Sequence, residues 1–121
     1  MTVTTQIIDI VSAEHYKWGG SKGTDCDGWH LVKTPELSVI EELIPSGRSE
    51  ARHSHRYARQ FFYVLDGELT MEVGHRIFTL RGGQGIEVSP GQEHQALNKS
   101  ASLTRLLVIS QPPGQGDRLP A

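Results

Sequence analysis

Residues 47–67 read GRSEARHSHRYARQFFYVLDG and hold two histidines, His53 and His55, separated by one residue. Side chains two positions apart on a β-strand point to the same face, so both imidazoles are expected on one side of a sheet. On an inward face, the pair can present two nitrogen ligands to one divalent metal ion. The same spacing also suits two surface histidines, so the pair alone leaves both interpretations open.

Gln60, in the same stretch, is expected to face the core. Residues 66–67 (Asp-Gly) lie between two apolar runs, which is typical of a two-residue β-hairpin turn. Residues directly opposed across such a hairpin share a face. The expected pairs are Val64 with Leu69, Phe62 with Met71 and Gln60 with Val73. A buried amide must be hydrogen-bonded or must coordinate something, so Gln60 is either satisfied by backbone groups or is a further metal ligand.

Residues 68–73 and 76–81 are expected to form a second hairpin around a tight turn at residues 74–75. This turn places Phe78 opposite Met71 and Leu80 opposite Leu69. The second hairpin therefore extends the apolar core face.

The opposite face of the strand predicted at residues 60–65 carries Phe61, Tyr63 and Leu65. Three large apolar side chains are too many for a fully solvated face. We therefore expect an N-terminal strand or a second subunit to cover them, and we predict a homodimer.

A second stretch, residues 83–98, reads GQGIEVSPGQEHQALN. A predicted strand runs into the turn at Pro90 and Gly91, and His94 follows three residues later. The turn reverses the chain, so His94 can point back toward the interior.

The whole chain, residues 1–121, is read as one domain with many short strands, which favours an all-β sandwich or barrel. Residues 12–28 are expected to hold a short turn of helix and then a loop. The tail, residues 111–121, is rich in Pro and Gly and is expected to be loose or laid across a neighbour. The remaining predicted strands are residues 5–11, 29–33, 36–44, 51–56, 85–89, 92–98 and 102–110.

Composition narrows the classes of partner. The net charge is −2, from 12 basic and 14 acidic residues. This balance lacks the excess of positive charge that is typical of proteins that bind nucleic acid or an anionic membrane. Cys26 is the only cysteine and is expected to be a free thiol in a reducing compartment. No signal-peptide pattern or membrane-spanning apolar run is present in the sequence, and we expect a cytoplasmic protein.

The two stretches together resemble the cupin superfamily. The first cupin motif has a glycine, five residues, His-x-His, then a glutamate and a second glycine. Gly47, His53, His55 and Gly67 fall in register with it, and Gln60 stands where the glutamate is usual.

The second cupin motif has a glycine, a Pro-x-Gly turn, a histidine and an asparagine. Gly83, Gly91, His94 and Asn98 fall in register with it. Ser89 stands at the first proline of the turn, with a proline directly after it. Two motifs in the correct order are a strong indication of fold.

The resemblance implies a double-stranded β-helix, or jelly-roll barrel, with one divalent metal ion near its centre. The implied ligands are His53, His55, Gln60 and His94, and Zn, Ni, Fe, Mn and Co all suit them. Some similar cupins with three His and one Gln act on unsaturated uronates in pectin degradation, assisted by an acidic residue on the last barrel strand. Residues 102–110 contain no Asp or Glu.

The chemistry expected at this site follows from its charge. Three imidazoles and an amide are neutral, so the ion keeps its full charge and favours a small anionic, oxygen-rich ligand such as a sugar acid or keto-acid. The absence of a carboxylate ligand disfavours one-electron oxidation, so we expect a Lewis-acid enzyme, an isomerase or lyase. Two alternatives stay open, a non-catalytic small-molecule-binding cupin and an Fe-dependent dioxygenase.

Three further residues are candidate catalytic helpers. Tyr57 and Arg59 lie between the His pair and Gln60, where Tyr57 can donate a proton and Arg59 can clamp a carboxylate, or both can lie in a solvated connection. Arg105, on the last predicted strand, would bind an anion if it faced inward and would be a surface charge otherwise. The histidines without a partner at ligand spacing are expected to be structural or surface residues: His15, His30 and His75.

Overall fold

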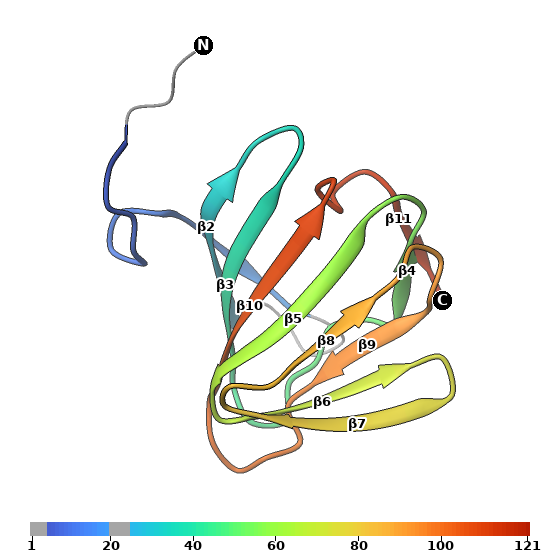
Figure 1. Ribbon diagram of the computed structural model, residues 1–121. Coiled ribbons are helices and arrows are strands. Elements are labelled where there is room, and N and C mark those ends of the chain that lie inside the picture. Colours follow the sequence, from blue (N-terminus) through green and yellow to red (C-terminus); the bar gives the residue numbers. More distant parts are fainter. Residues whose placement is uncertain (1–4, 20–24) are drawn as a thin grey trace.

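The computed structural model describes residues 5–19 and 25–121 and arranges their strands in two antiparallel sheets that face each other (Figure 1). The six-stranded sheet has the order β1 (Glu14–Trp18), β2 (Cys26–Lys33), β3 (Ser38–Ile44), β10 (Thr104–Gln111), β5 (Arg59–Asp66) and β8 (Gly85–Val88). The five-stranded sheet has the order β11 (Arg118–Pro120), β4 (His53–His55), β9 (His94–Leu97), β6 (Glu68–Val73) and β7 (Arg76–Arg81).

The path of the chain between the sheets gives the architecture. From β4 to β5, and again at each step from β7 to β11, the chain passes from one sheet to the other. This alternation is that of a double-stranded β-helix, so the predicted all-β jelly-roll barrel is confirmed. The described residues form no helix, and no membrane-spanning helix is found among them.

The predicted hairpin at residues 66–67 is wrong. Strands β5 and β6 do not pair, because Gly67 carries the chain from one sheet to the other. Gly67 has φ +90°, and a Cβ there would lie 2.6 Å from the carbonyl oxygen of Leu103, so this crossover requires a glycine. The predicted core face is nevertheless correct, because alternation along each strand decides which side chains point inward. Its members are buried between the sheets: Gln60, Phe62, Val64, Leu69 and Met71.

The predicted register of the second hairpin is confirmed. Strands β6 and β7 pair directly around the turn at residues 74–75, with Met71 opposite Phe78 and Leu69 opposite Leu80. Gly74 has φ +60°, which suits a tight turn. Here the local turn chemistry and the tertiary pairing agree.

The N-terminal assignment needs correction. No strand forms at residues 5–11; instead, the Asp9 carboxylate accepts hydrogen bonds from the backbone N–H groups of Val11 and Ser12 and holds a turn. Residues 12–28, where a helical turn and a loop were expected, contain β1 and the start of β2. The two strands pair with each other, and such pairing is a tertiary contact that the local apolar pattern does not reveal.

The tail of the chain is ordered and packs within the same barrel. Strand β11 pairs with β4, with Arg118 opposite His55 and Pro120 opposite His53. Pro120 is tolerated because β11 is an edge strand. The tail therefore lies directly beside the His-x-His pair.

The apolar residues Phe61, Tyr63 and Leu65 lie on the outer face of the six-stranded sheet. Phe61 is 38% exposed and Leu65 is 40% exposed. The described N-terminal strand does not cover them, because β1 extends the sheet at its far edge beside β2.

Candidate metal centre

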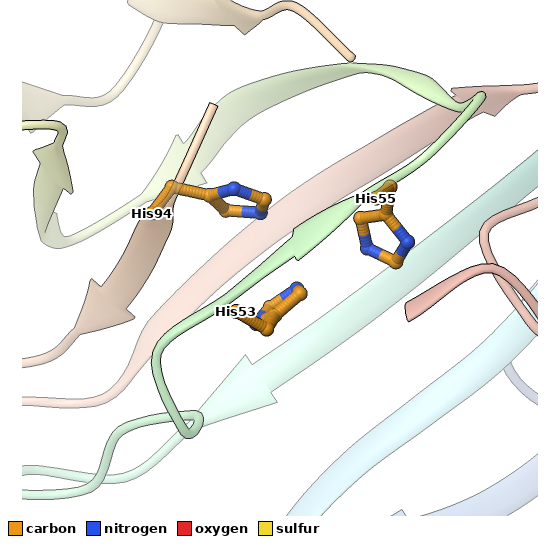
Figure 2. A group of neighbouring side chains, drawn as sticks. All are labelled: His53, His55 and His94. Atoms are coloured by element: carbon orange, nitrogen blue, oxygen red, sulfur yellow. The ribbon is translucent and has the colours of Figure 1, made fainter. Parts of the chain in front are cut away.

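Three imidazoles converge inside the barrel. His53 and His55 lie on the same face of β4, and His94 lies directly opposite His53 on β9. One nitrogen from each ring lies within 4.8 Å of the others, and all three residues are buried. Figure 2 shows the three rings turned toward a common space. The predicted association of the two histidine motifs is therefore present in the fold.

Hydrogen bonds orient each imidazole. The Nδ1 atom of His53 lies 2.7 Å from the carbonyl oxygen of Ala51, and that of His94 lies 3.0 Å from the carbonyl oxygen of Gln92. A proton on Nδ1 donates to each oxygen and leaves the Nε2 lone pair available to a metal ion. The Nε2 atom of His94 is buried and has no hydrogen-bond partner in the described structure.

His53 and His94 are suited to bind a cation because they resist protonation. Burial is the largest of the causes that lower the pKa of His53 to about 4; the hydrogen bond to Ala51 opposes it, and the neighbouring His94 and Arg118 reinforce it. Burial likewise lowers the pKa of His94. Both rings are therefore neutral at neutral pH, the state in which imidazole is a metal ligand.

Gln60 presents an oxygen to the same interior. Its Nε2 donates to Ser110 Oγ at 3.0 Å, whereas its Oε1 is buried without a hydrogen-bond partner. A buried carbonyl oxygen without a partner is costly unless an ion or water meets it. The three histidines and Gln60 thus fit a divalent ion with three nitrogen ligands and one oxygen ligand. That Gln60 coordinates the ion stays a prediction.

Asp117 is a residue of the site that the sequence did not reveal. Its Oδ1 lies 2.8 Å from His55 Nδ1, and its Oδ2 accepts hydrogen bonds from the backbone N–H groups of Tyr57 and Ala58. Burial by itself raises the pKa of Asp117, but these three donors together hold it below its ordinary value. An ionised carboxylate behind an imidazole fixes the ring and increases its basicity.

A cavity of about 230 Å³ adjoins the histidines and is lined by His53, His55 and Gln60. Two carboxyl groups, those of Glu42 and Glu50, also line it, together with Arg118. The last barrel strand carries no acid, as the sequence indicated, but β3 and the segment before β4 supply these two. Alternation along residues 38–44 places Glu42 inward beside Ile40 and Ile44, a signal that the sequence does contain.

The pKa values of both carboxyl groups are raised, which favours their protonated forms. Burial raises the pKa of Glu42 to about 8, helped by the nearby Glu50 and opposed by Arg118. Burial raises the pKa of Glu50 to about 7, opposed by the Ala96 N–H and Arg118. Glu50 Oε1 lies 3.9 Å from His53 Nε2, so an acid stands at the edge of the ligand group.

A family model described as a cupin domain matches residues 39–110. This chain belongs to the cupin family. Over 108 residues, this cupin is 24% identical to the polyketide synthase CurC of Streptomyces cyaneus, covering 88% of this chain and 70% of that protein.

Solved structures agree with the fold of this cupin. The polyketide cyclase RemF of Streptomyces resistomycificus matches with a TM-score of 0.81 at 15% identity, covering 98% of this chain and 86% of that one. A predicted oxalate decarboxylase from Thermotoga maritima matches with a TM-score of 0.80 at 16% identity, covering 89% of this chain and 100% of that one. At these identities the likeness shows the fold alone.

The three candidate helpers are not brought to the cavity of this cupin. Tyr57 is 65% exposed in the connection after β4. Arg59 forms an ion pair with Glu87, and Arg105 forms one with Glu41. Because Gln60 on β5 and Leu106 on β10 point inward, the arginines directly before them point outward.

Replacing Glu42 by glutamine is expected to stabilise the metal-free cupin by an amount that grows with pH. The pKa of Glu42 rises from 4.5 to about 8 on folding, so its contribution to stability is complete below about pH 4.5 and is lost as pH rises through about 8. Urea unfolding of both proteins near each end of this range measures the difference. Glu41→Gln, on the outer face of the same strand, is the control. An equal gain for Glu42→Gln at both pH values would contradict the prediction.

Proposed function

We propose that this cupin binds one divalent metal ion through His53, His55, Gln60 and His94 and acts as a Lewis-acid enzyme. The proposed reaction class is isomerisation or elimination on a small anionic, oxygen-rich substrate such as a sugar acid or keto-acid. One observation carries the proposal, namely that three of the four proposed ligands, His53, His55 and Gln60, line the same cavity as two carboxyl groups whose pKa values are raised by burial.

Each part of this cavity has a chemical role. A bound divalent ion would supply Lewis acidity, polarising a carbonyl or hydroxyl oxygen of the substrate. Glu42, with a pKa raised to about 8, can take up or release a proton near neutral pH, which is the requirement for general acid–base work. Arg118, at the cavity wall, provides a guanidinium to a substrate carboxylate. Because Glu42 and Glu50 can each carry a negative charge, they favour a substrate of low negative charge over a highly charged one.

The relatives support this class of substrate without selecting one member. Polyketides and oxalate, which appear in the names of the similar proteins, are both rich in carbonyl oxygens. Because one fold hosts many reactions, the residues of the cavity carry more weight than these names.

The proposal is tested by assaying the protein, loaded in turn with Zn, Ni, Fe, Mn and Co, against uronates, keto-acids and hydroxy-acids. We expect metal-dependent turnover of one class without consumption of oxygen. Tight ligand binding without turnover by any metal form would instead indicate a non-catalytic binding protein. Oxygen uptake during turnover would indicate a dioxygenase. Glu42→Gln is expected to reduce turnover and to leave the metal content unchanged.

Replacing Gln60 by glutamate is expected to keep the metal and to weaken anion binding. The added carboxylate lowers the net charge of the site by one, and we expect oxalate to bind on the order of tenfold more weakly, about 1.4 kcal/mol. Calorimetric titration of oxalate into the metal-loaded proteins measures the change. Gln84→Glu is the matched control, because it adds the same charge on the exposed surface. Equal weakening by both variants would show that the effect is not local to the site.

The outer face defined by Phe61, Tyr63 and Leu65 supports our further proposal of a homodimer, because an apolar face of this kind is favourably buried against a second copy. Sedimentation at micromolar concentration tests it, and a monomer would refute it. We also propose a cytoplasmic location, supported by Cys26, which is buried as a free thiol.

A further inference from the structure

A second and larger cavity adjoins the one at the histidines. It has a volume of about 590 Å³, against about 230 Å³ for the inner cavity. The two share five lining residues: Tyr16, Glu42, Glu50, Gln115 and Arg118. We call the larger one the vestibule. Small-molecule sites usually measure roughly 300–1,000 Å³, so the inner cavity alone is small for a site and the vestibule falls within the usual range.

The vestibule lies at the end of the six-stranded sheet that is formed by β1 and β2. Tyr16 and Trp18 on β1 lie opposite Gly28 and Cys26 on β2, and His30 follows on the same face. These residues lie at the end of the sheet beyond β3, and Arg118 of β11 lines the same space from the other sheet. On this face Cys26 belongs to the hydrophobic core and Trp18 packs against it, whereas Tyr16, Trp18 and His30 also border the cavity.

Three aromatic side chains, those of Tyr16, Trp18 and His30, line the vestibule. Tyr16 and His30 lie with ring centroids 5.0 Å apart, and Trp18 lines the same space. A Cβ at Gly28 would lie 2.3 Å from the Tyr16 ring, so glycine allows the ring to lie against the strand. Trp18 Nε1 donates to the carbonyl oxygen of Asp27 at 3.3 Å, which holds the indole in place. Such fixed rings favour stacking or edge contacts with another ring.

One polar atom in this wall lacks a partner. His30 Nδ1 is buried without a hydrogen bond in the described structure. Burial lowers the pKa of His30, and Lys33 lowers it further, so the ring is neutral. Depending on the tautomer, its Nδ1 can donate one hydrogen bond to a hydroxyl group or accept one from it. A buried ring nitrogen of this kind is costly unless a ligand or water meets it.

The charges of the vestibule favour a neutral ligand there. Lys33 is paired with Glu14 at 3.1 Å. Arg118 is the other cation that lines the described vestibule, and it faces Glu42 and Glu50, whose pKa values it lowers. Lys33 is thus compensated, and Arg118 is one of the residues that the vestibule shares with the inner cavity, where we assign its guanidinium to the oxygen-rich end of the substrate.

We propose that the vestibule is a binding subsite for the hydroxylated aromatic ring system of a substrate whose oxygen-rich end reaches the histidines. The second half of this statement rests on the proposed function, whereas the binding of the ring does not require a metal. A substrate of this kind would fill both cavities at once.

The test uses 2-naphthol as the probe and Trp29→Phe as the background, so that Trp18 is the only tryptophan. Trp29 lies on the outer face of β2, beside His15, and does not line the vestibule. We expect 2-naphthol to quench Trp18 fluorescence and to bind at least about tenfold more tightly than its saturated analogue 2-decalol, a difference of about 1.4 kcal/mol. Binding should be the same with and without metal, and oxalate should not displace the probe.

Variants locate the site. Trp18→Leu and His30→Leu, followed by calorimetry, are expected to weaken 2-naphthol binding about tenfold, whereas Trp29→Leu should leave it unchanged. Equal affinity for 2-naphthol and 2-decalol in the unaltered protein would overturn the proposal without any variant, and so would unchanged affinity in both vestibule variants. Failure to bind metal would refute the proposed function alone, because the probe is expected to bind the metal-free protein equally well.

Discussion

Replacing His94 by alanine is expected to remove most of the divalent metal from protein purified without added metal. His94 supplies one of three imidazole nitrogens that lie within 4.8 Å of one another, and no carboxylate belongs to that group. The remaining ligands, His53, His55 and Gln60, are neutral and offer no net charge to hold an ion. We expect the affinity to fall by more than the roughly 10–100-fold that is typical when an outer hydrogen-bond partner is lost.

Elemental analysis of the purified proteins measures this loss. His75→Ala is the control, because His75 lies in the exposed turn between β6 and β7. Circular dichroism of each variant separates loss of metal from loss of fold. The double variant His53→Ala/His55→Ala is the sharpest test, since full metal content in that protein would place the metal elsewhere.

Replacing Asp117 by alanine is expected to lower metal affinity by about 10–100-fold although Asp117 is not a ligand. Its carboxylate accepts a hydrogen bond from His55 Nδ1 at 2.8 Å and so directs the opposite nitrogen of that ring inward. Without it, the ring can rotate or change tautomer, and the N–H groups of Tyr57 and Ala58 lose their acceptor. Gly114 lies against the same ring, where a Cβ would be 2.8 Å from His55 Cε1, so the position of the imidazole is set from two sides.

Competition with a chelator of known affinity measures the change. Asp117→Asn keeps one acceptor oxygen and is expected to fall between the alanine variant and the original protein. Asp25→Ala removes an aspartate that is ion-paired with Arg48 outside the site and should leave the affinity unchanged. Unaltered affinity in Asp117→Ala would show that the hydrogen bond to His55 does not orient the ligand.

Asp117 also contributes to stability in a defined pH range. Because its pKa is lower in the folded state, the contribution is present above the ordinary aspartate pKa and is lost as pH falls through the folded value. The same carboxylate thus attaches the C-terminal segment to the connection after β4 and also orients the proposed ligand His55.

The sequence by itself determined which side chains of a strand share a face. The positions of His53, His55 and Gln60 follow from the alternation of side chains along a strand, which is a local property of the extended backbone. The same rule extends to Glu42, whose neighbours at 40 and 44 are apolar, whereas the sequence left open whether Arg59 and Arg105 reach the site. Where a tight turn joins two strands of one sheet, as between β6 and β7, the register could be predicted as well.

Only the tertiary structure decided which strands pair across the barrel and which residues form hydrogen bonds to the proposed ligands. The turn chemistry at residues 66–67 is that of a hairpin, yet the next strand joins the other sheet because its partners, β7 and β9, lie there. Asp117 meets His55 across 62 residues, and the vestibule depends on β1 pairing with β2 at the open edge of a sheet. Side-chain alternation requires only neighbouring residues, whereas these contacts depend on the closure of the whole barrel, and no spacing within the chain encodes them.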